Sequence, residues 1–369
     1  MTSYERSIAA IEHKSVDRFP IISLGVDYAF YNEFMEEIGF TPEEVKQYAT
    51  DGILTGPPWS HGVNVKLGVD IDWTSMRARQ HYDHETHQIL DTFGGIDKVV
   101  VNDSGIPHLW YVKPFLTSKE KIKDWWNLGR PKPYTNAMIK PLVKIMQTLI
   151  DKYQMLSMIG LPGPWENLHM SIGMAQVAKF CRKDQRFLEE ILEKNFEVQG
   201  DGLERIMKLG NPPVVMCGDD YGFNQGLQMP IKYWRQFIKP ILKRYVEIVH
   251  SYGSKFLLHS CGSIGDIFSD LIEIGVEGVE SLQPTINDLV TLKHKYGDKI
   301  ALLGTIDDTN LLVRGTTEHV WSEVTNSVKL LGKESGYLPG ATNTLLNAKV
   351  SNVKTMIEAI QSMNPQYVI

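Results

Sequence analysis

The feature of this sequence that most constrains its fold is the regular return of short apolar runs. Each run is followed by a polar or glycine-rich turn, and most are then followed by an amphipathic stretch. Eight runs have the length and composition of buried strands. They are RFPIIS (18–23), GILTG (52–56), MLSMIGL (155–161), PVVMCGD (213–219), KFLLHSC (255–261), EGVESLQ (277–283), IALLGTI (300–306) and YLPGA (337–341). Eight strands that mostly alternate with helices are typical of a (β/α)8 barrel. We therefore expect an α/β fold, a single (β/α)8 TIM barrel that occupies residues 1–369.

The stretches between the runs show helical spacing of apolar residues. In YWRQFIKPILKRYVEIVHSYG (233–253) this spacing ends at Gly253. Pro240 should divide the stretch into two helices, because a proline inside a helix loses a hydrogen bond and clashes with the preceding turn. The first residues, MTSYERSIAAIEHK, predict an N-terminal helical extension.

One interval breaks the alternation. Between Gly56 and Met155 lie roughly a hundred residues, far more than a normal connection. Within it, NVKLGVDIDW (64–73) and DKVVVND (97–103) predict strands of an antiparallel segment inserted after the second barrel strand, at about residues 60–150. No internal repeat or clear linker divides the chain, so we expect one domain.

Charge and cysteine content narrow the function classes. The net charge is −6 and no basic stripe is present, which argues against a nucleic-acid partner. No apolar stretch reaches the roughly 18 residues that a membrane span needs. Three scattered cysteines, Cys181, Cys217 and Cys261, predict reduced thiols rather than a disulfide framework. The charged N-terminus lacks the apolar core of a signal peptide, so we expect a cytoplasmic protein.

His259 and Cys261 end one of the predicted strands, in the segment LLHSCGSIGD (257–266). Residues i and i+2 of a strand lie on the same face, and active sites of these barrels lie at the carboxyl ends of the strands. Imidazole and thiolate are both zinc ligands. A buried cysteine beside a hydrogen-bonded histidine remains the alternative.

Four carboxylates at predicted strand ends are candidates for a third metal ligand: Glu166, Asp219, Asp220 and Glu280. Of these we assign Glu280 to the metal with His259 and Cys261. Glu166 and Asp220 are assigned, with His259, to catalysis close to the substrate. Capping of a helix or pinning of a loop is the alternative for Asp219 and Asp220.

Other residues at the predicted strand ends suit substrate binding. Four aromatic residues could wall a pocket for a quaternary ammonium or a flat arene, although residues of this type more often belong to the core. Three polar residues could contact the substrate, with capping as the alternative. The substrate-binding set is Tyr28, Trp59, Trp165, Tyr221, Gln283, Asp307 and Asn343.

Several segments together resemble the uroporphyrinogen decarboxylase superfamily. They are ERSIAAIEHKSVDRFPI, GLPGPWEN, CGDDYGFNQGLQMPIKYWRQFIKP, LLHSCGSIGDIFSDLIEIGVEGVESLQP, LLGTIDDTNLL and SNVKTMIEAI. The H-x-C-G element resembles the corresponding element in the corrinoid-dependent methyltransferase branch of this superfamily. Within that branch, the resemblance is to enzymes of the O-demethylase or glycine betaine type. The resemblance implies a (β/α)8 barrel, and it places Glu166 near the substrate.

Two departures from the family pattern matter. The stretch FPIISLGVDYAFYNEF (19–34) has no arginine, whereas the decarboxylases are rich in arginine there to meet the carboxylates of the tetrapyrrole. The segment LPGATN (338–343) has Ala341 where the zinc-bearing methyltransferases resemble each other in a third cysteine ligand. The first departure weakens the decarboxylase interpretation, and the second requires another third ligand.

The resemblance implies a methyltransferase that moves a methyl group from an aryl methyl ether or a quaternary amine to cob(I)alamin. The corrinoid would be supplied by a separate corrinoid protein, and zinc would assist the transfer. Reverse transfer to a thiol acceptor stays open, and the family often forms homodimers. A decarboxylase of uroporphyrinogen or a related carboxylated compound is the alternative function, and a non-catalytic binding module is the third.

Overall fold

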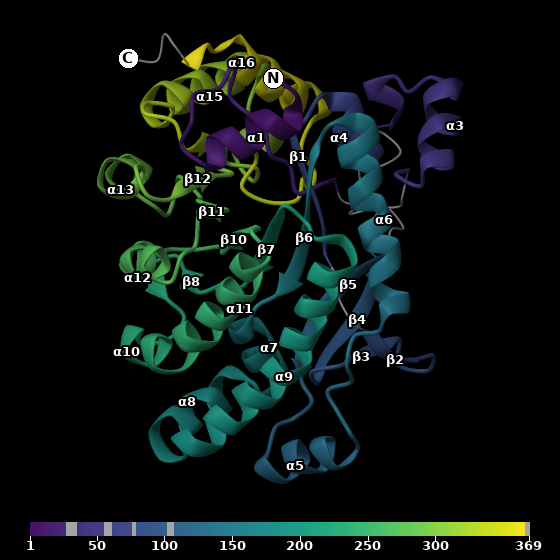
Figure 1. Cartoon of the computed structure of the whole chain (residues 1–369), viewed down its shortest axis with the longest axis vertical. Helices are drawn as coiled ribbons and strands as arrows, with labels where there is room; N and C mark the ends of the chain where they lie inside the picture. Colours follow the sequence, from purple (N-terminus) through teal and green to yellow (C-terminus); the bar gives the residue numbers. More distant parts are fainter. Residues whose placement is uncertain (27–34, 55–60, 76–78, 102–106, 366–369) are drawn as a thin grey trace.

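The computed structural model describes residues 1–26, 35–54, 61–75, 79–101 and 107–365 (Figure 1). Tyr28 and Trp59, both predicted to bind substrate, lie outside the described residues.

Seven parallel strands form the central sheet. They occur in the order β1-β6-β7-β10-β11-β12-β13. Their bounds are β1 (Ile71–Ser75), β6 (Leu156–Pro162), β7 (Val214–Gly218), β10 (Lys255–His259), β11 (Gly278–Glu280), β12 (Ala301–Leu303) and β13 (Tyr337–Leu338). Ile22 makes isolated parallel bridges to Ile71 and to Gly340, so residues from the two edges of the sheet meet at Ile22. The sheet is therefore curled.

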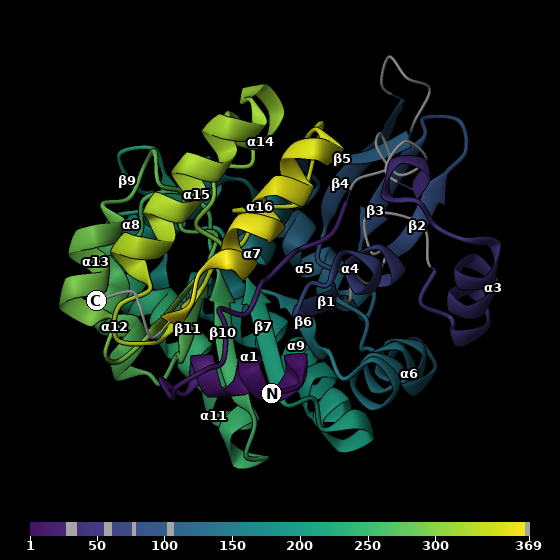
Figure 2. The ribbon, with the colours of Figure 1, turned by 90° about the horizontal axis from the view of Figure 1, so that it is seen from above.

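Helices of varied length connect and surround the strands (Figures 1 and 2). They are α1 (Ser3–Ile11), α3 (Pro42–Asp51), α4 (His61–Leu67), α5 (Lys119–Asn127), α6 (Asn136–Tyr153), α7 (Pro164–Ile172), α8 (Met174–Lys183), α9 (Gln185–Gly210), α10 (Ile231–Tyr233), α11 (Lys239–Ser251), α12 (Phe268–Glu273), α13 (Leu289–Tyr296), α14 (Leu311–Arg314), α15 (Thr317–Leu331) and α16 (Val350–Ser362). Within the described ranges, no helix has the length and apolar character that crossing a membrane requires.

An apolar core fills the inside of the curled sheet. Its members come from alternate positions of the strands, among them Ile71, Met158, Met216 and Leu257. Ala10 and Ile11 of α1 belong to the same cluster. Helix α1 therefore packs against the amino end of the sheet, opposite the carboxyl end at which sites of this fold lie (Figure 2).

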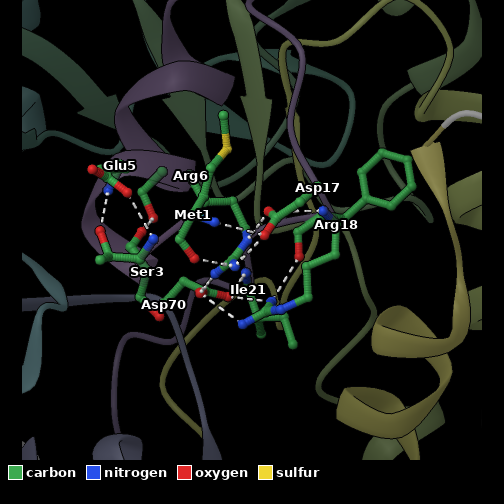
Figure 3. A network of polar contacts seen from close by, with 11 residues as sticks. Met1, Ser3, Glu5, Arg6, Asp17, Arg18, Ile21 and Asp70 are labelled. Carbon is green, nitrogen blue, oxygen red and sulfur yellow. Dashed lines mark hydrogen bonds and ion pairs between the residues drawn. The ribbon is translucent and has the colours of Figure 1, made fainter.

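An ion-pair network holds α1 to the amino end of β1 (Figure 3). Asp70 is fully buried and pairs with Arg6 at 2.8 Å and with Arg18 at 2.7 Å. It also accepts the Ile21 N–H at 2.9 Å. Because a buried charge is costly unless it is paired, this carboxylate fixes where the first strand segment lies.

A four-stranded antiparallel sheet lies between β1 and β6 in the chain, in the order β2-β3-β4-β5. Its strands are β2 (Arg79–Asp83), β3 (Gln88–Asp91), β4 (Gly95–Val101) and β5 (Pro107–Pro114). The Tyr111 hydroxyl donates to the Met170 carbonyl of α7 at 3.1 Å. The strand predicted at 97–103 thus corresponds to β4, and the antiparallel sheet is attached to the helix that follows β6.

Two strand predictions in this region are wrong. Residues 52–54 do not form a strand, because Gly52 ends α3 in the left-handed conformation, with φ of 73°. The segment 64–73 does not join the antiparallel sheet. It contains the end of α4 and the start of β1, and β1 pairs in parallel with β6.

The long stretch around Pro240 is helical without a break from Ile231 to Ser251, so the prediction that the proline divides it into two separate helices is wrong. A π-helical turn, Trp234–Ile238, leads into α11, and Pro240 occupies the first turn of that helix. The π-helical turn immediately before it is the irregularity that accommodates the proline, which has no N–H to donate to the preceding turn.

Candidate functional site

His259 is the last residue of β10 and lies in register with Gly218 of β7 and Glu280 of β11. Leu257, two residues earlier, belongs to the apolar core inside the sheet. Because side chains alternate along a strand, His259 points to the same interior side, at the carboxyl end.

Glu280 fixes the orientation of the His259 ring. Its carboxylate is fully buried and is hydrogen-bonded to Nδ1 of His259. Burial disfavours protonation of the ring, but the Glu280 carboxylate and Cys261 outweigh burial and raise the pKa of His259 well above its ordinary value. Burial raises the pKa of Glu280, against the opposing effect of His259. The ring therefore presents Nε2, and not Nδ1, to the rest of the site.

Nε2 of His259 lies 3.6 Å from Oδ1 of Asp220 and 3.8 Å from Sγ of Cys261. The backbone N–H of Cys261 donates to Oδ1 of Asp220 at 2.8 Å, which ties the two loops together. Sγ of Cys261 also lies 3.2 Å from the Ser281 hydroxyl and 3.7 Å from Nδ2 of Asn343. The thiol thus lies among polar partners and not in the apolar core.

The turn after Cys261 requires glycine. Gly262 has φ of 83°, and a Cβ there would lie 2.7 Å from Cα of Gly222. Gln283 accepts the Gly262 N–H at 2.9 Å. Two chain segments therefore touch backbone to backbone, and this contact positions Cys261 next to Asp220.

Asp220, His259 and Cys261 each offer a ligand atom, and these atoms lie within 4.8 Å of one another. A carboxylate, an imidazole nitrogen and a thiolate form a zinc donor set that leaves a fourth position open. Glu280 matches the carboxylate that commonly orients a metal-binding histidine through its other nitrogen. The residues present fit a zinc ion.

Asp219 has a different place from Asp220. It is fully buried and accepts the N–H groups of Trp165 at 3.0 Å and Glu166 at 2.7 Å. Burial, and then the nearby Glu166, raises the pKa of Asp219 well above its ordinary value. Because Gly163 has no side chain to cap α7, Asp219, the residue after β7, supplies the cap. Asp219 therefore caps a helix, which was the alternative interpretation of this residue. Glu166 lies in the first turn of the same helix, α7.

Trp165 and Tyr221 are each 2% exposed. The Trp165 indole N–H donates to Gln228 at 3.0 Å. Tyr221 packs edge-on against Trp234, with ring centroids 5.5 Å apart. Both side chains thus belong to the packed interior beside the site.

The other predicted substrate residues divide into two groups. Gln283 and Asn343 contact the Cys261 turn, as described above. Asp307 accepts the N–H groups of Thr309 and Asn310 at 2.9 and 2.8 Å, so it has the capping contacts that the alternative interpretation expected.

The sequence interpretation did not single out Trp73 and His169. The Trp73 ring is within 18° of parallel to the His259 ring, with centroids 6.4 Å apart. His169 lies on α7 with its ring 5.0 Å from that of Trp165. Burial lowers the pKa of His169 to about 4, against the opposing charge of Asp220. His169 could have been found from its position one turn after Glu166 on the same helix. Trp73 could have been found only if β1 had been predicted as a strand.

Fold and site together define a curled parallel α/β sheet with a His–Cys–carboxylate cluster at its carboxyl end. The chain belongs to the uroporphyrinogen decarboxylase (URO-D) family, whose sequence model matches residues 100–363. It is 29% identical over 200 residues to the methylcobamide:CoM methyltransferase MtaA of Methanosarcina barkeri. That match covers 54% of this chain and 56% of the relative, so it spans about half the length of each.

A solved methyltransferase from Methanosarcina mazei has a similar fold. The TM-score is 0.67 at 18% identity, over 98% of this chain and 99% of that one. The matches confirm the resemblance to the corrinoid-dependent methyltransferase branch.

Proposed function

We propose that this protein is a corrinoid-dependent methyltransferase. It moves a methyl group from a methylated small molecule, an aryl methyl ether or a quaternary amine, to cobalt(I) of a corrinoid on a partner protein. The observation that carries the proposal is the group of Asp220, His259 and Cys261 at the carboxyl end of β10. The similarity to MtaA supports it.

The proposed zinc ligands are His259, Cys261 and Asp220, with Glu280 as the orienting carboxylate. The alternative third ligand is Glu280, which the sequence analysis assigned to the metal together with His259 and Cys261. When bound, zinc supplies a Lewis acid that stabilises charge on the departing atom. The chain's own residues hold the donors in place: Glu280 orients the ring, and the backbone of Cys261 holds Asp220.

The proposal also keeps two structural expectations. The bridges at Ile22 support an eighth strand that closes the sheet into a (β/α)8 barrel. One domain, with the antiparallel sheet as an insertion, is the matching proposal for the domain organisation. The homodimer stays a prediction.

The name of the relative favours a second candidate, transfer of a methyl group from a methylated corrinoid to a thiol. The same donor set suits this direction, because a metal-bound thiol is deprotonated. Decarboxylation of uroporphyrinogen is the remaining alternative. Within the described part of 19–34, no arginine is present to meet its carboxylates.

The test is an anaerobic assay with free cob(I)alamin and methyl donors of both classes, in which the absorbance of methylcobalamin is followed. Methyl transfer that is lost in Cys261→Ser supports the proposal. Methylation of a thiol by methylcobalamin, without the forward reaction, would favour the second candidate. Turnover of uroporphyrinogen without either transfer would contradict the proposal.

A further inference from the structure

The loop that follows β11 makes several contacts with the turn that carries Cys261. The Ser281 hydroxyl lies 3.2 Å from Sγ of Cys261. Gln283 accepts the Gly262 N–H at 2.9 Å, and Nδ2 of Asn287 donates to the Gly262 carbonyl at 3.1 Å. One loop therefore holds the thiol, the N–H and the carbonyl of this turn, and Ser281 is the residue of the loop that reaches the sulfur.

The backbone of Ser281 has an unusual conformation. Its φ is 72°, in the left-handed region that residues other than glycine seldom adopt. Among the described non-glycine residues with positive φ, Ser281 is the one that is fully buried. Such a conformation persists where the surrounding structure requires it, and it is frequent beside functional groups.

This conformation brings two consecutive side chains to the same site. Glu280 is the last residue of β11, and its carboxylate is hydrogen-bonded to Nδ1 of His259. Successive side chains of an extended strand point to opposite faces, so Ser281 would point away from the site if the strand continued. Because the chain turns at Ser281, its hydroxyl instead lies beside Sγ of Cys261. Glu280 thus contacts one proposed zinc ligand, and Ser281 contacts another.

The hydrogen in the contact between Ser281 and Cys261 comes from the serine whenever the cysteine is a thiolate. A thiolate has no proton and can only accept a hydrogen bond, and it is the form that binds a metal. Asn343 offers an N–H donor to the same sulfur, but its Nδ2 lies farther away, at 3.7 Å. The Ser281 hydroxyl is therefore the closer of these two donors.

We infer that Ser281 is a positioning residue for the metal site. Its hydroxyl donates to the Cys261 thiolate, holds the sulfur beside His259 and Asp220, and draws electron density from the sulfur. The inference rests on the zinc site of the proposed function and adds to it a residue that is not a metal ligand. Hydrogen-bonding partners of metal ligands typically change metal affinity by about 10–100-fold.

The test replaces zinc by cobalt(II), which makes the metal–sulfur bond visible through a charge-transfer band in the near ultraviolet. The metal-free full-length protein is titrated with cobalt(II). The variants are Ser281→Ala, which removes only the hydroxyl, and Ser281→Gly, which also relieves the left-handed φ. Ser157→Ala is the matched control, because Ser157 is also fully buried but lies on β6, which β7 and β10 separate from β11.

Both Ser281 variants should bind cobalt(II) about 10-fold more weakly than the wild type, and Ser157→Ala should match the wild type. The charge-transfer band should move to longer wavelength in both Ser281 variants, because a sulfur without the hydrogen bond gives up its electrons more easily. Ser281→Gly should also unfold at a higher urea concentration than Ser281→Ala, since glycine adopts a positive φ without strain.

An unshifted band in both Ser281 variants would overturn the inference, because support of the loop alone does not change the electrons of the sulfur. Wild-type affinity in Ser281→Gly would also count against it, since the hydroxyl would then be dispensable. A wild-type protein without a sulfur–cobalt band would contradict the inference and the zinc site together. The expected shifts in a protein that transfers no methyl group would support the inference and contradict only the proposed function.

Discussion

Glu280 and His259 face each other on neighbouring strands, and the buried carboxylate is hydrogen-bonded to Nδ1 of the imidazole. Nε2 is therefore the nitrogen turned toward Asp220 and Cys261. Because the imidazole is already held in this orientation, it would not need to rotate in order to bind a metal through Nε2.

Glu280→Gln should weaken zinc binding. The amide keeps the shape of the side chain but removes the charge that holds the ring and makes Nε2 more basic. Loss of such an orienting carboxylate typically costs about 10–100-fold in metal affinity. Competition with a chromophoric chelator measures the change, with Asp307→Asn as a control at another strand end. Unchanged affinity in Glu280→Gln would show that the ring is positioned by other contacts.

Asp219 should contribute through α7. Asp219→Ala leaves the N–H groups of Trp165 and Glu166 without their acceptor, so we expect a loss of about 1–2 kcal/mol in the free energy of unfolding. Asp219→Asn keeps an acceptor and removes a buried acid, and it should cost less. Urea unfolding of both variants checks this order. A larger cost for Asn than for Ala would contradict the capping role.

His169 should make the protein less stable in mild acid. Its folded pKa is about 4, below the ordinary value of 6.5, so between these pH values the unfolded chain binds the extra proton. Stability from this group is complete above pH 6.5 and is lost as the pH falls toward 4. At pH 5 the loss should be about 1–2 kcal/mol relative to pH 7.

The check on His169 is urea unfolding at pH 7 and pH 5 of the wild type and of His169→Gln. The variant should lose less stability between the two pH values than the wild type does. The same loss in both proteins would assign the acid sensitivity to other groups.

Asp70→Asn should be strongly destabilising. It leaves the Arg6 and Arg18 guanidinium groups without their buried partner, and removal of one member of such a pair costs about 3–5 kcal/mol. Asp17, whose side chain is 44% exposed, pairs with the same Arg6 and provides the control. Asp17→Asn should cost less than about 1 kcal/mol. Thermal unfolding should separate the two variants by several degrees. Similar melting temperatures would contradict the structural role of Asp70.

Most of the central sheet was predictable from the sequence because its strands are continuous apolar runs. The runs at 155–161, 213–219, 255–261 and 300–306 each contain a strand of the sheet. A strand that is buried on both faces consists mostly of apolar residues, so it appears in the sequence as a continuous apolar run.

The strand β1 could not be found in this way. Its sequence, IDWTS, contains a buried aspartate, and such a pattern does not indicate a buried strand. The structure explains it: Asp72 is bonded to Nδ1 of His61 at 2.8 Å and to Nδ2 of Asn64 at 3.0 Å. The hydrogen bonds that satisfy this buried aspartate come from residues of α4. The spacing of residues along the chain does not predict these contacts.

The candidate site was predictable where its residues end apolar strands, as His259 and Cys261 do. The different places of Asp219 and Asp220 were not, because neighbouring aspartates look alike in a sequence. Only the position of α7 turns Asp219 toward the helix and leaves Asp220 beside Cys261. Trp73 was missed together with its strand.

The central claim is that Asp220, His259 and Cys261 hold one zinc ion. Elemental mass spectrometry of the protein, purified after growth with added zinc, tests it most directly. The account predicts about one zinc per chain in the wild type. Zinc should be lost in Cys261→Ser and Asp220→Asn and retained in Cys181→Ser, which changes a buried cysteine on α8. A folded wild-type protein without zinc, or full zinc content in Cys261→Ser, would contradict it.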